Sequence, residues 1–198
     1  MGGDSPAPLG LMGQAGAAPG AATLWAIVPK VRGAKHQAAI VEGVGALLAE
    51  LLPRYGVTTP LRQAHFLAQA AHETDSFCVL EEYASGRASE GRRDLGNLIP
   101  GDGMRFKGRG ILQTTGRSNY ARAAKRLGLD LLNHPELLAE PRAALEAACL
   151  YWQDRGINAA ADRDDVRAVT RLINGGLTGL DAREAFTARA KAALGRAL

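Results

Sequence analysis

The segment that most constrains the fold is one that cannot be a helix, residues 74–107. Five glycines occur in it at close intervals, with a proline and an aspartate that also favour turns: Gly86, Gly91, Gly96, Gly101, Gly103, Pro100 and Asp102. Such residues form turns and leave room only for a short β-hairpin. An irregular segment of this length inside a compact domain is usually functional or forms a lid. We therefore expect an irregular part set between helical parts.

The residues before this segment have the pattern of amphipathic helices. Apolar residues recur three and four positions apart over residues 35–52, and Pro53 and Gly56 are expected to end that helix. Thr59 followed by Pro60 is typical of a helix N-cap with proline at the first helical position. The next helix is therefore expected to run to about His72.

The residues after this segment predict further helices. They are expected over residues 120–126, 141–155, 166–174 and 181–194, with Ser118 or Asn119 and Asp164 or Asp165 as N-caps, and Gly128 and Gly175 as stops. Hydrophobic residues make up 46% of the 198-residue chain, which is enough for a core, and aromatic residues only 5%. Since alanine and leucine dominate, packed helices are favoured over a β-sandwich, and the expected fold class is mainly α.

The N-terminal residues 1–24 are rich in glycine, alanine and proline and carry one charge. They are interpreted as a flexible leader or linker, with the folded domain over residues 25–198. No basic region precedes their apolar residues, so no signal peptide is predicted. The chain has no run of about 18 apolar residues, so no membrane insertion is expected. A monomer is the default expectation.

The formal charge of +4 suits an anionic partner, such as a bacterial wall, a membrane surface or a nucleic acid. The cations cluster in one stretch, as Arg87, Arg92, Arg93, Arg105, Lys107 and Arg109. They form either a solvated rim or a contact surface for an anionic wall polymer. Nucleic-acid binding would need stacking aromatics between the charges, and only Tyr83 and Phe106 are near, so it is disfavoured.

Two carboxylates flank the point where helix gives way to irregular chain. Glu73 follows the apolar run AQAAH, and Glu82 lies nine positions further on. Glycoside hydrolysis usually takes two carboxyl groups, one as a proton donor and one as a base or nucleophile. The spacing alone does not bring the two together, and a surface glutamate at a helix end is the common alternative.

Other kinds of chemistry find less support. His65, Gln69 and His72 share one helical face near Glu73, but HETDS lacks the second histidine of a zinc HExxH motif, so a hydrogen-bonded histidine is favoured. The two cysteines lie far apart and form no CxxC pair, and two separate buried cysteines are favoured over a disulfide. GxSxG is absent, and the GRG at 108–110 lacks the ending of a phosphate loop. No metal or organic cofactor is expected.

At this point the ordered motifs match a known family. HET after FLAQ, then FKGRGILQTTGRSNY, then RLINGG resemble glycoside hydrolase family 19, which contains chitinases and phage endolysins. The likeness covers about residues 36–194, and LEEYASGRASEGRRDLGNLIPGDGMRFKGRG is most similar to the phage and prophage endolysin branch. The resemblance implies a lysozyme-like, two-lobed helical fold with a small irregular or β-hairpin lobe, and an inverting mechanism.

The resemblance also implies roles for individual residues. Glu73 matches the general acid and Glu82 the general base, with Glu81 and Glu90 as alternative bases. Thr115 matches a hydroxyl residue that helps to hold the attacking water. The residues expected to bind substrate are His72, Gln113, Asn119, Tyr120, Asn174 and Arg183. The disulfides and several substrate loops of plant members have no counterpart here, which favours peptidoglycan over crystalline chitin.

The leading hypothesis is therefore an endolysin-type hydrolase that cleaves β-1,4 bonds in the glycan strands of bacterial peptidoglycan. A chitinase acting on chitin oligomers, a lytic transglycosylase and a non-catalytic wall-glycan-binding protein remain as alternatives. As an endolysin without a signal peptide, the protein would wait in the cytoplasm until a membrane pore released it to the wall.

Overall fold

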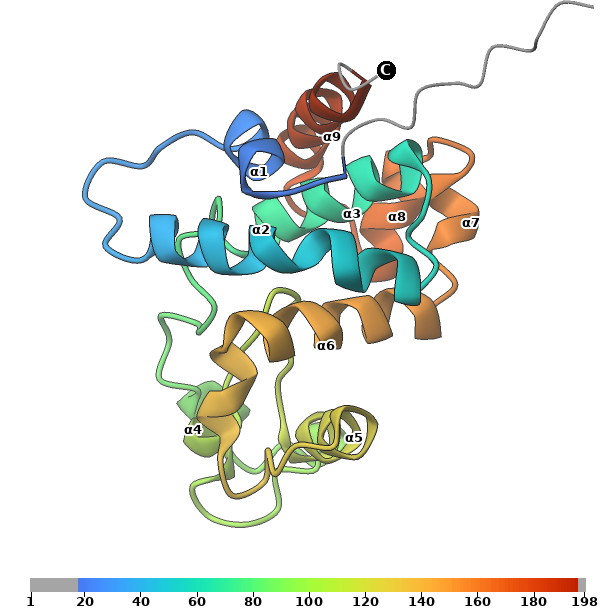
Figure 1. Ribbon diagram of the computed structural model, residues 1–198. Coiled ribbons are helices and arrows are strands. Elements are labelled where there is room, and N and C mark those ends of the chain that lie inside the picture. Colours follow the sequence, from blue (N-terminus) through green and yellow to red (C-terminus); the bar gives the residue numbers. More distant parts are fainter. Residues whose placement is uncertain (1–17, 196–198) are drawn as a thin grey trace, which may run out of the picture.

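The computed structural model describes residues 18–195, and these form two helical lobes on either side of one helix (Figure 1). The α-helices are α1 (Ala21–Ile27), α2 (Gln37–Arg54), α3 (Pro60–Glu73), α4 (Asp102–Arg105), α5 (Arg117–Leu127), α6 (Pro141–Asp154), α7 (Asn158–Ala161), α8 (Val166–Asn174) and α9 (Leu180–Gly195). Three 3₁₀ helices lie between them, η1 (Arg87–Ser89), η2 (Arg93–Leu95) and η3 (Pro135–Ala139). The mainly helical, lysozyme-like fold class is confirmed.

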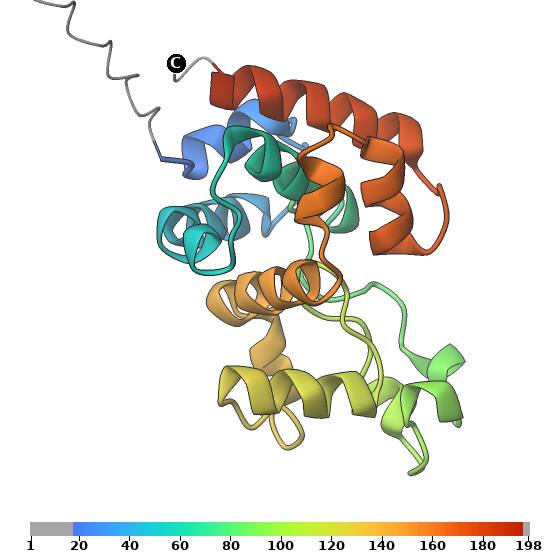
Figure 2. The ribbon, with the colours of Figure 1, turned by 90° about the vertical axis from the view of Figure 1, so that its right-hand side faces the viewer.

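Helix α6 connects the two lobes. On one side it packs against α2 in the large lobe, which consists of α1, α2, α3, α7, α8 and α9. On the other side it contacts α5 in the small lobe, which consists of α4, α5 and the irregular segments around them. The turned view in Figure 2 shows the same division, with α6 between the two groups. The small lobe has its own core, made of Phe106, Tyr120, Leu131 and Leu138.

Helix α3 is the central helix of the large lobe. Every residue from 64 to 71 is buried, so this helix is covered on all sides. Its most extensive contact is with α9, and four alanines in the buried run allow close approach. Its start is as predicted, because the Thr59 hydroxyl accepts a hydrogen bond from the Arg62 amide at 3.2 Å and Pro60 is the first helical residue. The helix therefore begins where the sequence predicts, and it carries Glu73 as its last residue.

The irregular segment 74–107 is confirmed, but a regular hairpin does not form. Within the described residues the β-structure consists of isolated antiparallel bridges, from Arg109 to Glu81 and from Arg109 to Thr114. The short helices η1, η2 and α4 account for ten of the 34 residues in this segment. Left-handed glycines separate these elements, as at Gly86 and Gly101, which both have positive φ.

The predicted leader boundary is wrong at its C-terminal end. Residues 1–17 lie outside the part of the chain that the structure describes, but Ala21–Ile27 form α1, which packs against α2 and α9. Leu24 and Ile27 are completely buried. The seven-residue helix is too short to show a clear period, and the glycine- and alanine-rich residues before it hide its start.

Helix ends differ from expectation at a few points. Helix α5 begins at Arg117 with Gly116 as its N-cap, so neither Ser118 nor Asn119 caps it. Pro53 lies inside α2 rather than ending it. Of the two predicted caps of α8, Asp165 is confirmed, since it accepts from the Ala168 amide at 2.9 Å. The predicted stops at Gly128 and Gly175 are confirmed, and both glycines are left-handed.

Between residues 18 and 195 no helix combines the length and the apolar character needed to cross a bilayer. Cys78 and Cys149 are both free and buried, as predicted.

His65 is the predicted hydrogen-bonded histidine of α3. Its side chain is completely buried, and its Nε2 lies 2.8 Å from Asp164 Oδ1. Asp164 also forms an ion pair with Lys191 of α9. Burial lowers the pKa of His65, and this effect outweighs the opposing influence of Asp164. The native protein therefore keeps this imidazole neutral where an unfolded chain would bind a proton.

This burial predicts a pH-dependent stability. The free energy of unfolding should fall as the pH drops below about 6.5, because the unfolded state then binds more protons than the native state. In His65→Gln the decrease between about pH 7 and pH 5 should be shallower, as measured by urea unfolding at several pH values. His134→Gln, at an exposed histidine of the small lobe, is the control. An unchanged slope in His65→Gln would contradict the prediction.

Candidate active site

Glu73 is the last residue of α3, and the chain turns sharply after it. Residues 75–77 are all left-handed, with φ between 50° and 62°. Thr74 fastens this turn, since its hydroxyl donates to the Ala70 carbonyl at 2.7 Å and accepts from the Phe77 amide at 2.9 Å. The carboxylate of Glu73 is thus held at the surface of the large lobe, with 19% of its side chain exposed.

Behind Glu73 lies a buried arginine from α9. Arg183 Nη2 donates to Glu73 Oε1 at 2.5 Å, and its side chain is only 1% exposed. Its Nη1 donates to Gln69 Oε1, and its Nε donates to the Thr178 carbonyl at 3.1 Å. Gln69 Nε2 in turn donates to Thr170 Oγ1 at 3.4 Å. The structure corrects the prediction for Arg183, because a buried side chain that binds Glu73 does not offer a substrate contact.

His72 lies beside the acid. The ring packs so closely on Gly179 that a Cβ at that position would overlap it. Partial burial lowers the pKa of His72, the Arg183 charge lowers it further, and Glu73 opposes both. The imidazole is therefore neutral at neutral pH. Asn174, the last residue of α8, is exposed at the start of the segment that leads to Gly179.

Glu82 belongs to the irregular lobe and is fixed by Gly108. The Glu82 amide donates to the Gly108 carbonyl at 2.9 Å, and the Gly108 amide donates to Glu82 Oε1 at 2.9 Å. The position that a Gly108 Cβ would take lies 2.8 Å from Gln113 Oε1, 3.3 Å from Thr115 Oγ1 and 3.4 Å from the carboxyl carbon of Glu82. Three predicted site residues therefore surround one small space.

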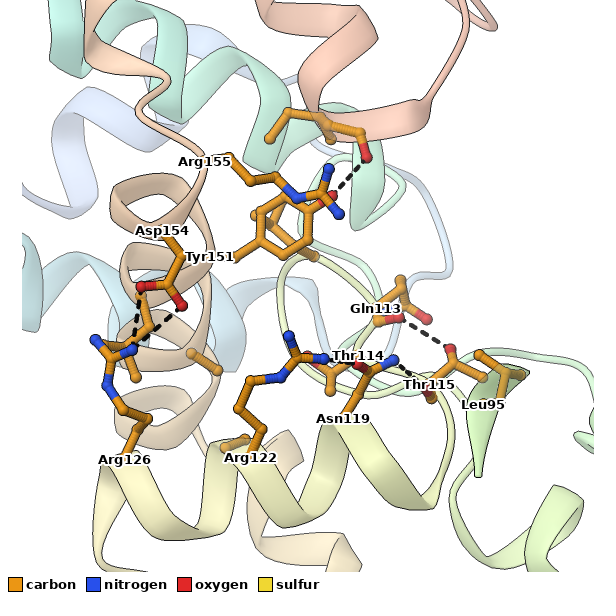
Figure 3. A pocket seen from close by; sticks show the side chains of 15 residues that line it. Leu95, Gln113, Thr114, Thr115, Asn119, Arg122, Arg126, Tyr151, Asp154 and Arg155 are labelled. Carbon is orange, nitrogen blue, oxygen red and sulfur yellow. Dashed lines mark hydrogen bonds and ion pairs between the residues drawn. The ribbon is translucent and has the colours of Figure 1, made fainter. Parts of the chain in front are cut away.

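The polar segment after Gly108 forms one wall of a cavity of about 580 Å³. Gln113, Thr115 and Asn119 all line it, and Figure 3 shows them together above the start of α5. The Thr115 hydroxyl donates to the Gln113 carbonyl at 3.0 Å, and Asn119 Nδ2 donates to the Thr115 carbonyl at 2.7 Å. The sequence placed these three residues near one another, and the structure brings them into one cavity.

The two alternative bases are occupied in other ways. Glu81 pairs with Lys107 at 2.6 Å and with Arg109 at 2.9 Å. Partial burial raises the pKa of Glu81, but the hydrogen bonds from these two cations outweigh it and the net shift is downward.

Glu90 accepts from the Gly101 and Gly103 amides at 2.6 and 2.7 Å, so its carboxylate holds a loop together. The Glu82 carboxylate, by contrast, accepts from one backbone amide within the described residues. This favours Glu82 over Glu81 and Glu90 as the base.

Tyr120 does not line the cavity, contrary to expectation. Its side chain is 0% exposed, and its hydroxyl donates to the Lys107 carbonyl at 2.7 Å while accepting from Arg109 Nη1 at 3.1 Å. Burial raises the pKa of Tyr120 to about 12. The residue therefore supports the backbone that carries Gly108. The sequence pattern shows that this helix is amphipathic, but it does not show which polar side chains point into the protein.

Several residues of the predicted cationic stretch form contacts with other groups of the protein. Lys107 and Arg109 neutralise Glu81, and Arg92 pairs with Asp94 at 2.5 Å. Arg105 donates to the Leu132 carbonyl at 2.8 Å. Only Lys107 and Arg109 are withdrawn from solvent in this way, while Arg87, Arg92, Arg93 and Arg105 are exposed.

Several residues that line the cavity were not predicted from the sequence. They come from the facing sides of α5 and α6 and from the residue after α6: Arg122, Arg126, Tyr151, Asp154 and Arg155. Helical spacing in the sequence shows which of these residues share a face of the same helix. No sequence signal indicates that the two helices face each other across a cavity.

Gly108 offers a test of this arrangement. The residue lacks a left-handed φ, so alanine is allowed there, but its methyl group would displace the Gln113 side-chain amide and crowd Glu82 and Thr115. Since small misplacements can cost about 100-fold in rate, we expect kcat of Gly108→Ala to fall by that order while thermal stability changes little. Gly195→Ala, where a methyl group meets open space, is the control. Equal activity of the two variants would contradict the prediction.

Comparison with known proteins identifies the family of this chain. The family model described as chitinase class I matches residues 55–169. A glycosyl hydrolase family 19 domain-containing protein of Haemophilus influenzae is 30% identical over 175 residues, which cover 72% of this chain and 85% of that protein. An endochitinase of Arabidopsis thaliana is 37% identical over 131 residues, 65% of this chain. The chain spans 44% of that plant protein's length.

Solved structures share the fold. Chitinase C from Streptomyces griseus superposes with a TM-score of 0.66 at 21% identity, over 88% of this chain and 75% of the other. A bacterial family 19 chitinase gives a TM-score of 0.64 at 25% identity, over 88% and 93% of the two chains. The chain belongs to glycoside hydrolase family 19 and is a chitinase-like glycoside hydrolase.

Proposed function

We propose that this enzyme is an endolysin-type hydrolase that cleaves β-1,4 bonds in the glycan strands of bacterial peptidoglycan with inversion. The observation that carries the proposal is the convergence of the Glu82 carboxylate, the Thr115 hydroxyl and the Gln113 amide around Gly108. The second carboxylate, Glu73, stands on a different element and is backed by a buried arginine. An inverting hydrolase needs two carboxyl groups, one as the general acid and one as the general base.

Each group has a distinct task in the proposed reaction. Glu73 protonates the oxygen of the leaving sugar, and Arg183 fixes the orientation of that carboxyl group. Glu82 removes a proton from a water molecule, which attacks the anomeric carbon from the other face of the ring. The Thr115 hydroxyl and the Gln113 amide border the same space beside Gly108 as the Glu82 carboxylate, which supports a role for them in orienting this water. The two carboxyl groups of such a site are expected to lie about 6.5–9.5 Å apart.

Peptidoglycan is proposed over chitin for two reasons. The segment from Leu80 to Gly110 is similar to the endolysin branch, and the chain carries a net charge of +4, which suits an anionic wall. In the cell, such an enzyme would reach the wall from the cytoplasm through a membrane pore. The competing candidate is a chitinase, which the endochitinase relatives favour.

The test compares two substrates of the purified chain. We expect peptidoglycan sacculi to release fragments that carry one added water per cleaved bond, detected by mass spectrometry. Proton NMR of fresh products should show the inverted anomer. Turnover of chitohexaose without any release from sacculi would identify the enzyme as a chitinase. Anhydro products would identify a transglycosylase, and binding without product would identify a non-catalytic glycan-binding protein.

A further inference from the structure

Two arginines in the cavity have no acidic partner in the described part of the chain. Arg122 of α5 donates through Nη2 to the Asn119 side-chain oxygen. Arg155, directly after α6, lies over the Tyr151 ring at 4.4 Å and donates to the Leu172 carbonyl at 3.4 Å. Arg126, by contrast, forms an ion pair with Asp154 at 3.0 Å. The cavity therefore keeps two positive charges that only neutral groups hold in place.

These two guanidinium groups come from different walls of the same cavity. Figure 3 shows Arg122 reaching up from α5 and Arg155 reaching across the Tyr151 ring from the end of α6. Both line the cavity that also contains Gln113, Thr115 and Asn119. Gln113 and Thr115 line this cavity and also border the space beside Glu82, so the cavity that holds the two arginines adjoins the surroundings of the proposed base.

The way in which each arginine is held prepares it for an anion. A guanidinium group has five N–H donors in a rigid plane, and the contacts above use only one or two of them. The remaining donors match the two oxygens of a carboxylate. Stacking on Tyr151 limits the motion of Arg155 without cancelling its charge. Ala123, Ala147 and Leu150 line the same cavity and offer an apolar surface beside these charges.

We propose that this cavity binds a carboxylate-bearing substituent of the glycan, namely the short acidic peptide attached through a lactyl ether to alternate sugars of peptidoglycan. The peptide carboxylates pair with Arg122 and Arg155, and small aliphatic side chains of the peptide contact the apolar surface. Chitin carries no such group, so the two arginines select between the two polymers. This inference rests on the proposed function and adds the residues that determine its specificity.

The test measures binding to an inactive background, Glu73→Gln, by calorimetry. The probes are a disaccharide that carries its acidic peptide and the neutral chitotetraose. Removing both guanidinium groups in Arg122→Gln/Arg155→Gln should reduce the affinity for the peptide-bearing ligand about 10- to 100-fold more than the affinity for chitotetraose, since hydrogen bonds to charged groups are strong. The difference should shrink at high ionic strength. Arg167→Gln, at an exposed arginine of α8, is the matched control.

A charge-retaining variant separates binding from misfolding. Arg122→Lys/Arg155→Lys should keep a clear preference for the peptide-bearing ligand, and melting temperatures check that every variant is folded. Equal weakening of both ligands in the glutamine variant would overturn the inference. The parent enzyme's release of fragments from sacculi reports the proposed function independently. If that release is absent and the peptide-bearing disaccharide does not bind, both the proposed function and this inference fail.

Discussion

Replacement of Glu73 by glutamine is expected to lower kcat for glycan cleavage by about 10²- to 10⁴-fold, the usual contribution of a general acid. Glutamine has the shape of glutamate and keeps an oxygen that can accept the hydrogen bond from Arg183. It cannot give a proton to the leaving oxygen. The loss should therefore appear in kcat, with substrate affinity and the circular dichroism spectrum largely preserved.

The same assay distinguishes the three possible bases. Glu82→Gln should lose activity to a similar extent. Glu81→Gln and Glu90→Gln should lose less, and any loss should accompany lower stability, because these carboxylates hold Lys107 and the loop at Gly101 in place. Glu184→Gln, an exposed glutamate on α9, is the control. Lysis that persists undiminished in Glu73→Gln would show that another group is the acid.

Replacement of Arg183 by alanine is expected to destabilise the protein by about 3 kcal/mol, the lower end of the range for breaking a buried ion pair. The lower end applies because Glu73 is still 19% exposed and can be partly hydrated. The substitution leaves the Glu73 carboxylate and the buried Gln69 amide without their common partner. It also removes a large side chain from between α3 and α9.

Urea unfolding measures this loss directly. Arg167→Ala on α8 is the control and should change the free energy of unfolding by less than about 0.5 kcal/mol, as is usual for exposed sites. Arg183→Lys should fall between the two, because an ammonium group keeps the charge but cannot bridge both partners in one plane. A change in Arg183→Ala as small as that of the control would show that the ion pair contributes nothing to stability.

The sequence predicted those parts of the fold that depend on neighbouring residues. Thr59 and Pro60 begin α3 through contacts within one turn, and the glycines at 128 and 175 end helices because they can adopt a left-handed conformation. Helix α1 was not predicted because its burial depends on packing against α2 and against α9, which lies far away in the sequence. Helices of one turn, such as α4 and α7, carry too few residues to show a period.

The same distinction applies to the site: residues that are close in sequence could be predicted together, and residues that packing brings together could not. Gln113, Thr115 and Asn119 are close in sequence and remain close in the structure. The partnership of Glu73 and Arg183 spans 110 residues and depends on how α3 and α9 pack. The burial of a side chain cannot be read from the sequence either, so the resemblance implied substrate contacts for Arg183 and Tyr120 although both are buried.

The left-handed turn after α3 affects any attempt to engineer this enzyme. Each non-glycine residue in that conformation costs about 1–2 kcal/mol, and residues 75–77 adopt it in succession. Glycine at Asp75 or Ser76 would relieve this strain and is an obvious stabilising substitution. The same turn fixes the end of the helix that carries Glu73, so the added backbone freedom would loosen the acid. Thermostability gained at this turn would therefore be expected to trade against catalytic rate, and stabilising substitutions are better placed in the large lobe away from α3.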